Sequence, residues 1–341
     1  MEKDLDHDNG LDKIKGILII YVVFGHVMEE IRLDGFLGVI RSVIYSFHMP
    51  AFIFISGYFA KNLKKTYDSA FASCLLPFAV FNTLWLLLTE ESWYLYMLQP
   101  VYVFWFMLSL FFWRVSIPVL SKIRGVLWIS FVLSLYVGLI GSADRFLSIS
   151  RTLSFLPFYL LGFLCSEENL SRIRKIPHIL CILLLGAMFF LTALMNIKQF
   201  VPVKMYEFIQ SYEKCGISDK FGILQRGIIL LFAMIIIVCL LNLAGLKESL
   251  FCKIGRRTAA IYLLSSFIIH AIFHLIVKYN GMGRIVGNWK LSILLSVVLT
   301  AAVLLLCGNH YVDKGYHAAM KKISALFVRE ILPHSRRKLK I

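Results

Sequence analysis

Long apolar stretches recur along almost the whole chain, and most of them are long enough to cross a lipid bilayer. A membrane-spanning helix needs roughly 20 mostly apolar residues, because the hydrocarbon layer is about 30 Å thick. Hydrophobic residues make up 59% of the 341 residues and charged residues only 16%, which excludes an ordinary soluble domain. The sequence therefore predicts an all-α polytopic integral membrane protein.

The apolar runs predict about ten transmembrane helices. We place them at 12–31, 36–60, 70–89, 94–113, 117–140, 152–165, 177–196, 222–245, 257–278 and 290–310. We expect a transmembrane domain over residues 1–312 and a basic cytoplasmic tail over residues 313–341. The first segment, without a small-residue cleavage site after it, is expected to stay in the chain as a membrane anchor.

The basic residues predict the orientation in the membrane. Cytoplasmic loops collect Lys and Arg, and most of the 36 basic residues fall on one side if the N-terminus is cytoplasmic. An even number of helices then places both termini in the cytoplasm. The net charge of +16 is spread over successive loops and the tail, which indicates attraction to anionic membrane lipids and argues against a nucleic-acid partner. The opposite side carries a loop over 197–221, long enough to have a role of its own.

Ionisable residues stand inside the first apolar segment, DKIKGILIIYVVFGH. Such residues are costly in a bilayer, so each is a candidate functional group. The spacing from Lys15 to His26 is three helical turns plus about 20°, which puts both on one face roughly 16 Å apart. Asp12 lies one turn before Lys15. The alternative is that Lys15 extends to the inner interface and His26 lies among lipid headgroups at the outer end.

The second apolar segment, IYSFHMPAFIFISGY, carries a similar set. Arg41 and His48 are two turns apart on nearly one face, and Pro50 should break local helical hydrogen bonds. Ser56 and Gly57 allow a close backbone approach two turns further on. Irregular backbone at this depth is tolerated where it lines a cavity, so the group predicts a polar cavity between helices.

The sequence carries no recognisable motif for binding a metal ion or a nucleotide. The seven cysteines are scattered and favour core packing over disulfides or a metal site. His270 and His274 share a helix face, but no glutamate stands between them and no third ligand is in view, so we predict packing or placement at the membrane interface, and no metal ion. No Walker-type loop, G-x-G-x-x-G fingerprint or G-x-S-x-G elbow is found.

Two motifs resemble those of the membrane-bound acyltransferase 3 family, in its fucose 4-O-acetylase-like branch. The first is D-x-x-K-G-I…V-V-x-G-H, from Asp12 to His26. The second is F-H-M-P-x-F-x-F-I-S-G-Y, from Phe47 to Tyr58. Weaker matches follow at 75–77, 105–106, 151–162 and 254–264. The order of motifs and the number of apolar segments match along nearly the whole chain.

The resemblance implies transfer of an acyl group, usually acetyl from cytoplasmic acetyl-CoA, to a hydroxyl of a glycan or other envelope acceptor. The histidine that closes the first motif, His26 here, is the catalytic residue that the family implies, and Lys15 is the basic residue before it. The chain departs from the family where Ser265 follows YLL in place of histidine. It departs again before Trp105, where Val103 and Phe104 replace a nearby histidine.

The chemistry that the family implies assigns roles to the candidate residues. A hydroxyl attacks a thioester slowly until a base takes its proton, so His26 would be the base or a transient acetyl carrier. The catalytic candidates are His26, Lys15 and His48. The candidates for contacts with acetyl-CoA are Arg256, Arg257, Lys15, Ser56 and Gly57, and those for acceptor contacts are Asp12, Arg41, Trp105 and Arg151. Ordinary positive-inside charge is the alternative for Arg256 and Arg257, and interfacial placement is the alternative for Arg151.

The leading hypothesis is an acetyl-CoA-dependent O-acetyltransferase of the bacterial plasma membrane. It would act on capsular polysaccharide, exopolysaccharide or a lipid-linked sugar, with membrane lipids as its other partners. A transporter or flippase, whose permeation path the same charges would line, is the alternative from another class, and a non-catalytic membrane scaffold is a third. Nothing in the sequence indicates an oligomeric state.

Overall fold

The computed structural model describes residues 8–31, 35–89, 98–143, 146–278 and 288–331. Over these residues the regular structure is helical and contains no strand. The helices are α1 (Asn9–Ile31), α2 (Phe36–Tyr58), α3 (Leu63–Ala70), α4 (Leu76–Thr89), α5 (Trp105–Leu120), α6 (Val126–Tyr136), α7 (Ile149–Leu164), α8 (Glu167–Arg174), α9 (His178–Ile197), α10 (Val203–Glu207), α11 (Asp219–Leu243), α12 (Leu250–Gly255), α13 (Thr258–Lys278), α15 (Trp289–Cys307) and α16 (His310–Ile331). A π-helical turn over Phe71–Leu75 joins α3 to α4 in one continuous rod.

Each of the ten predicted segments contains a helix in the described part of the chain. Seven are long and apolar enough to cross a membrane by length and composition: α2, the rod from α3 to α4, α7 with the turn before it, α9, α11, α13 and α15. The segments of α5 and α6 are apolar but shorter, and α1 carries charges at both ends. The all-helical, multi-pass architecture is therefore confirmed, while ten spans and cytoplasmic termini stay predictions.

The predicted fourth and fifth segments, 94–113 and 117–140, are displaced along the chain. The described residues before α5 form turns, because Tyr102 has a φ of 47° and the backbone N–H of Val101 donates to Asn82 Oδ1 at 3.0 Å. The apolar pattern that predicted helix here belongs to residues that line a cavity. The helical prediction for this stretch is wrong, and α5 begins later than expected.

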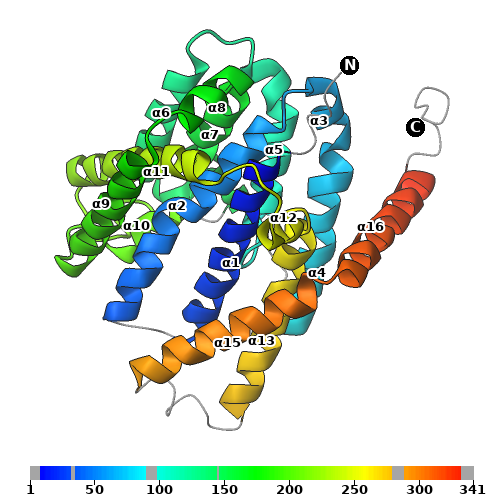
Figure 1. The fold of residues 1–341 in the computed structure, drawn as a ribbon. Coiled ribbons are helices and arrows are strands. Elements are labelled where there is room, and N and C mark those ends of the chain that lie inside the picture. Colours follow the sequence, from blue (N-terminus) through cyan, green and yellow to red (C-terminus); the bar gives the residue numbers. More distant parts are fainter. Residues whose placement is uncertain (1–7, 32–34, 90–97, 144–145, 279–287, 332–341) are drawn as a thin grey trace.

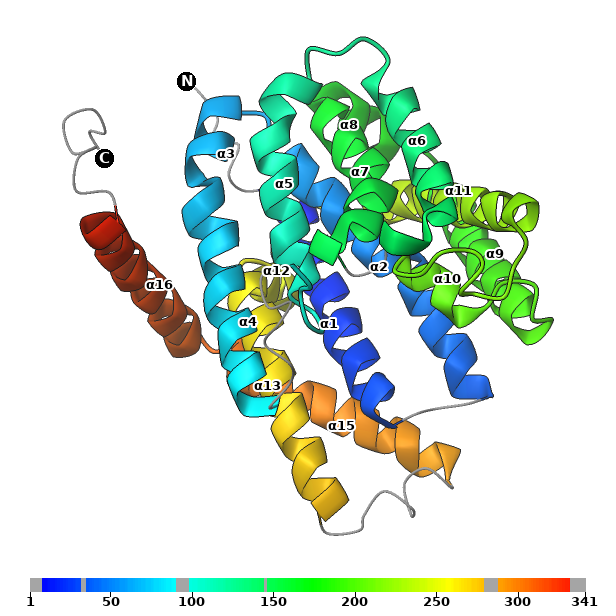
Figure 2. The ribbon, with the colours of Figure 1, turned by 180° about the vertical axis from the view of Figure 1, so that it is seen from behind.

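The bundle is arranged around α1 and α2 (Figures 1 and 2). Helices α9, α10 and α11 lie on one flank and the rod from α3 to α4 on the other, with α12 and α13 beside α1. Helices α2 and α7 pack closely, because Gly57 lies against the backbone of Tyr159 and Gly162 lies against that of Phe54. A Cβ at either glycine would collide with a carbonyl oxygen.

The outer surface of the bundle is largely apolar. Large side chains on α9 and α15 are exposed, including Ile179 at 64%, Phe190 at 66% and Leu305 at 77%. Apolar patches of this extent are unfavourable in water and typical of surfaces that face lipid. Helix α16 differs, since it extends away from the bundle with many polar side chains exposed (Figure 1).

Candidate active site

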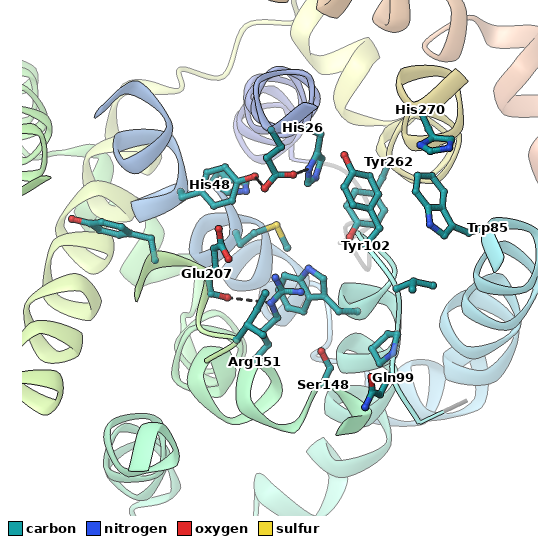
Figure 3. A pocket seen from close by; sticks show the side chains of 18 of the residues that line it. His26, His48, Trp85, Gln99, Tyr102, Ser148, Arg151, Glu207, Tyr262 and His270 are labelled. Carbon is teal, nitrogen blue, oxygen red and sulfur yellow. Dashed lines mark hydrogen bonds and ion pairs between the residues drawn. The ribbon is translucent and has the colours of Figure 1, made fainter. Parts of the chain in front are cut away.

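A cavity of about 830 Å³ lies among α1, α2, α4, α7, α10, α13 and the turns before α5. This volume is within the range of small-molecule sites in proteins. Figure 3 shows His26 and His48 on one side of the cavity and Arg151 and Gln99 on the other. The cavity that the sequence predicted beside the second apolar segment is therefore present, and it holds side chains from both of the first two helices.

His26 is held in place by Glu29, one turn later on α1. The distance from His26 Nδ1 to Glu29 Oε2 is 2.8 Å, and the Tyr45 hydroxyl donates to the other carboxylate oxygen of Glu29. An ionised carboxylate only accepts hydrogen bonds, so Nδ1 donates, and in the neutral ring Nε2 then carries the lone pair. The arrangement leaves one basic nitrogen on an oriented imidazole in a polar cavity, which is what proton abstraction requires.

His48 supports this pair from α2. Its Nδ1 donates to the Ile44 carbonyl oxygen at 2.8 Å, and its ring lies edge-on to Tyr45 with centroids 4.9 Å apart. The side chain is buried, and it lines the cavity. His48 thus packs behind Tyr45, the residue that fixes the second oxygen of Glu29.

A second carboxylate enters the cavity from the long connection between α9 and α11. Glu207, at the end of α10, accepts a hydrogen bond from Arg41 at 2.6 Å. The Arg41 guanidinium also lies 5.4 Å from the centroid of the Tyr45 ring. Arg41 therefore ties the loop that carries Glu207 to the same tyrosine that contacts Glu29.

Arg151, from the first turn of α7, reaches the same cavity. Its Nε donates to the backbone oxygen of Glu207 at 3.1 Å, and its guanidinium lies over the Trp105 ring at 4.5 Å from the centroid. Figure 3 draws the Arg151 bond to Glu207 as a dashed line. A stacked guanidinium is oriented and keeps further N–H donors for a ligand.

Aromatic side chains cover the remaining wall. Tyr102 stacks on Trp85 with ring centroids 4.9 Å apart and lies 5.2 Å from the His26 ring. The hydroxyls of Tyr102 and Tyr206 are buried and form no hydrogen bond with any residue in the described ranges. Burial also raises the pKa of Tyr206, so its hydroxyl stays protonated at neutral pH. The Tyr102 and Tyr206 hydroxyls can thus donate hydrogen bonds to a ligand that binds beside these aromatic side chains.

Lys15, Asp12 and Arg256 form a separate cluster at the other end of α1. Lys15 Nζ lies 2.7 Å from Asp12 Oδ1, and Arg256 Nε lies 3.1 Å from Asp12 Oδ2. Arg256 also contacts Glu248 at 3.2 Å and Asn9 at 3.0 Å. The Asp12 contact raises the pKa of Arg256, which stays charged. None of the three main residues of this cluster lines the cavity.

The other predicted acetyl-CoA residues are also outside the cavity. Arg257 donates to the Gly308 backbone oxygen at 2.7 Å, and Ser56 Oγ donates to the Phe52 oxygen at 3.0 Å. Gly57 lies in the contact between α2 and α7. The structure gives each of these residues an internal partner, and their roles toward a cofactor stay predictions.

An apolar layer separates the two ends of α1. Leu18, Ile19 and Val23 are fully buried, and Val22 is 2% exposed. These four residues occupy the helical turns between Lys15 and His26. The predicted shared face therefore exists, but its two ends belong to different polar clusters.

Sequence reasoning missed several residues of the site, above all Glu29, Tyr45 and Glu207. The His26 to Glu29 spacing of one helical turn was a readable signal, since such residues meet on a helix surface. Glu207 had no such signal, because its contact with Arg41 joins distant parts of the chain. Of the predicted residues, His26, His48, Trp105 and Arg151 line the cavity, and Arg41 contacts it through Glu207.

Metal ligands are not gathered in the part of the chain that the structure describes. No group of three or more His, Cys, Asp or Glu side chains there is arranged to hold an ion. His270 lines the cavity beside Trp85, and its ring centroid lies 6.5 Å from that of His274. His270 therefore lies against an aromatic wall of the cavity, whereas His274 is exposed.

The apolar helices of membrane-spanning length and the polar cavity with its imidazole–carboxylate pair define a multi-pass membrane protein that carries the groups needed for acid–base chemistry. The chain is a member of the acyltransferase 3 family, since the family model described as an acyltransferase domain matches residues 8–308. The expected family is thus confirmed.

Two curated relatives are similar to parts of the chain. The nodulation protein NolL of Mesorhizobium japonicum is 29% identical over 184 residues, which cover 48% of each chain. The nodulation protein NolL of Sinorhizobium fredii is 34% identical over 93 residues, 26% of this chain and 25% of that protein. The matched region thus spans about half or less of these relatives. No solved structure matches the chain.

Proposed function

We propose that this protein transfers an acetyl group from acetyl-CoA to a hydroxyl of a cell-envelope glycan or lipid-linked sugar in the bacterial plasma membrane. One observation carries the proposal. Glu29 orients His26 in a cavity whose phenol and guanidinium groups can still donate hydrogen bonds to a ligand. Family membership supports acyl transfer, and a cavity that mixes rings with polar groups is suited to sugars.

In the proposed reaction His26 Nε2 takes the proton of the acceptor hydroxyl as its oxygen attacks the thioester carbonyl. A C–O bond forms, the C–S bond breaks, and the proton passes from the imidazolium to the departing thiolate of coenzyme A. Glu29 stabilises the imidazolium while it exists. An N–H or O–H donor of the cavity, such as the Tyr102 hydroxyl, would stabilise the oxyanion.

The donor is proposed to approach from the end of α1 that carries Lys15 and Arg256. Coenzyme A brings several phosphate charges, for which Arg256 and Arg257 are the proposed partners, with Lys15 further in and Ser56 and Gly57 beside the path of the acyl arm. In the structure Arg256 is paired with Asp12 and Glu248, so a phosphate would exchange with these carboxylates.

The acceptor is proposed to bind at the opposite end, against Trp105 and Arg151, with Arg41 holding Glu207 in the wall. A planar ring beside a guanidinium suits a sugar that offers both C–H faces and hydroxyls. Asp12, predicted from sequence as an acceptor contact, is fully buried in the other cluster, and we assign it instead to holding Lys15 and Arg256.

Transfer is tested with membranes that contain the full chain, isotopically labelled acetyl-CoA and extracted envelope glycan. We expect label on glycan hydroxyls with the parent chain and a loss of at least about 100-fold with His26→Ala, because a correctly positioned general base contributes about 10²- to 10⁴-fold to the rate. His317→Ala, on the exposed face of α16, is the matched control and should keep the parent rate. Equal labelling by His26→Ala would contradict the assignment, and flux of an envelope precursor without acetylation would favour transport.

A further inference from the structure

A second, smaller cavity of about 300 Å³ lies beside the first. Its walls are the turn at Gly141–Ala143, Phe146 before α7, and the chain that follows α10. Its volume is at the lower end of the range of ligand sites, which is room for one compact group.

The two cavities share Gln99 and Ile209 as lining residues. Figure 3 shows Gln99 beside Ser148, on the side of the main cavity away from His26. Ser148 lines the main cavity and Phe146, two residues earlier, lines the second. The loop after α10 likewise contributes Glu207 to the first cavity and Gln210 to the second, so the two cavities are neighbours along Gln99 and Ile209.

The lining of the second cavity is suited to hydroxyl groups. Gln99, Ser142 and Gln210 can each donate and accept hydrogen bonds, as sugar hydroxyls do. Gln210 Oε1 is buried and accepts no hydrogen bond from any residue within the described ranges. A phosphate only accepts, and Lys214, the one cation among the described residues of this lining, donates to the Gly141 oxygen at 3.0 Å. The chemistry therefore favours a sugar over a phosphate.

The far end of the second cavity is open. Phe146 is 41% exposed and Ser142 is exposed. An exposed aromatic ring at the rim gives a flat apolar face on which a sugar ring can pack. A chain of sugars could therefore continue outward over the exposed Phe146 and Ser142.

We propose that the acceptor is a glycan of at least two sugar units, with the acetylated unit in the main cavity and its neighbour in the second cavity against Gln210 and Phe146. This inference rests on the proposed acetyl transfer and narrows its substrate to oligomers or polymers. Single sugars would lack the contacts of the second cavity and bind more weakly.

The test uses membranes with the full chain, labelled acetyl-CoA and envelope glycan that is partly hydrolysed and separated into fractions of one, two and three sugar units. We expect KM to be about tenfold lower for two units than for one, as a few added hydrogen bonds would give. A third unit should change KM by less than about twofold, because the second cavity holds one group.

Two variants probe the second cavity itself. Gln210→Ala and Phe146→Ala should each bring the ratio of KM values between one and two units close to one. Lys204→Ala, exposed on α10 and outside both cavities, should keep the ratio. Equal KM values for one and two units with the parent chain, or a ratio that both cavity variants retain, would overturn the inference while transfer continues. Absence of transfer to every fraction and to the intact glycan would instead contradict the proposed function, and the inference with it.

Discussion

Two hydrogen bonds fix the Glu29 carboxylate beside His26, one from the imidazole and one from Tyr45. A carboxylate so held selects the imidazole tautomer and stabilises the positive charge that the ring gains when it takes a proton. At the scale of single residues, the reactivity of His26 thus depends on a neighbour that is not itself the proposed base.

Glu29→Gln should lower kcat for acetyl transfer by about 10²- to 10⁴-fold, because the amide has no charge to stabilise the imidazolium and offers donors as well as an acceptor. The measurement is initial rate with labelled acetyl-CoA at saturating acceptor. Glu213→Gln, exposed on the loop before α11, provides the matched control. A rate within twofold of the parent for Glu29→Gln would show that the carboxylate does not orient the base.

The sequence identified site residues correctly where the spacing along one helix was enough to place them. His26 and His48 were predicted as site residues because ionisable groups stood in apolar helices, and both line the cavity. Lys15 shares the helix face of His26, yet it pairs with Asp12 in another cluster, since buried side chains fill the turns between. Glu207 could not be predicted from the sequence, because its position in the cavity depends on how α10 packs against α2.

Helix α2 meets α7 through small residues, and this contact sets the position of two site helices at once. Gly57 and Gly162 let the backbones approach so closely that neither tolerates a Cβ. Small residues at such contacts are common between membrane helices, where packing replaces the hydrophobic effect. Since α2 carries His48 and α7 carries Arg151, a wider separation would also open the cavity between them.

Gly57→Val should lower the stability of the folded protein by about 3 kcal/mol, the upper end for overpacking, since the new side chain meets backbone atoms that cannot turn away. The measurement is the thermal unfolding midpoint of the purified protein in detergent. Gly186→Val, on α9 with open space around it, is the matched control. An unchanged midpoint together with weaker acetyl-CoA binding would favour the cofactor role predicted for Gly57 from sequence.

Helix positions were predicted well where apolar runs were long and isolated. The predicted segment 222–245 and α11 differ by a few residues at each end, as do 177–196 and α9. The prediction failed around Tyr102, because an apolar turn that lines a cavity has the same composition as a buried helix. The hydropathy of a segment does not reveal a backbone angle such as the positive φ of Tyr102, which prevents a helix there.

The whole molecule has an apolar outer surface, an internal polar cavity and two polar ends. Most exposed side chains on α9 and α15 are aliphatic or aromatic, as expected for contact with lipid. The basic loops predict that the end with Lys15 and Arg256 faces the cytoplasm. The loop that carries Glu207 and Gln210 would then face outward, on the side where envelope glycans are found.

This orientation is tested by labelling introduced cysteines in intact cells with a membrane-impermeant maleimide. The native cysteines are buried except for Cys215, so Cys215→Ser provides the background. Glu213→Cys should label in intact cells, and Lys175→Cys, exposed after α8, should label only after the cells are permeabilised. The reverse pattern would show that the protein lies in the membrane with the opposite orientation.

The buried layer of Leu18, Ile19, Val22 and Val23 has a consequence for the cell that holds the protein. Ions and protons cross hydrocarbon at great cost, so these buried apolar turns oppose the passage of charge between the two polar clusters of α1. In the proposed reaction an acetyl group would pass these turns, whereas a permanent polar opening there would discharge the membrane potential. Apolar turns at this place in α1 are thus compatible with a bilayer that stays energised between reaction cycles.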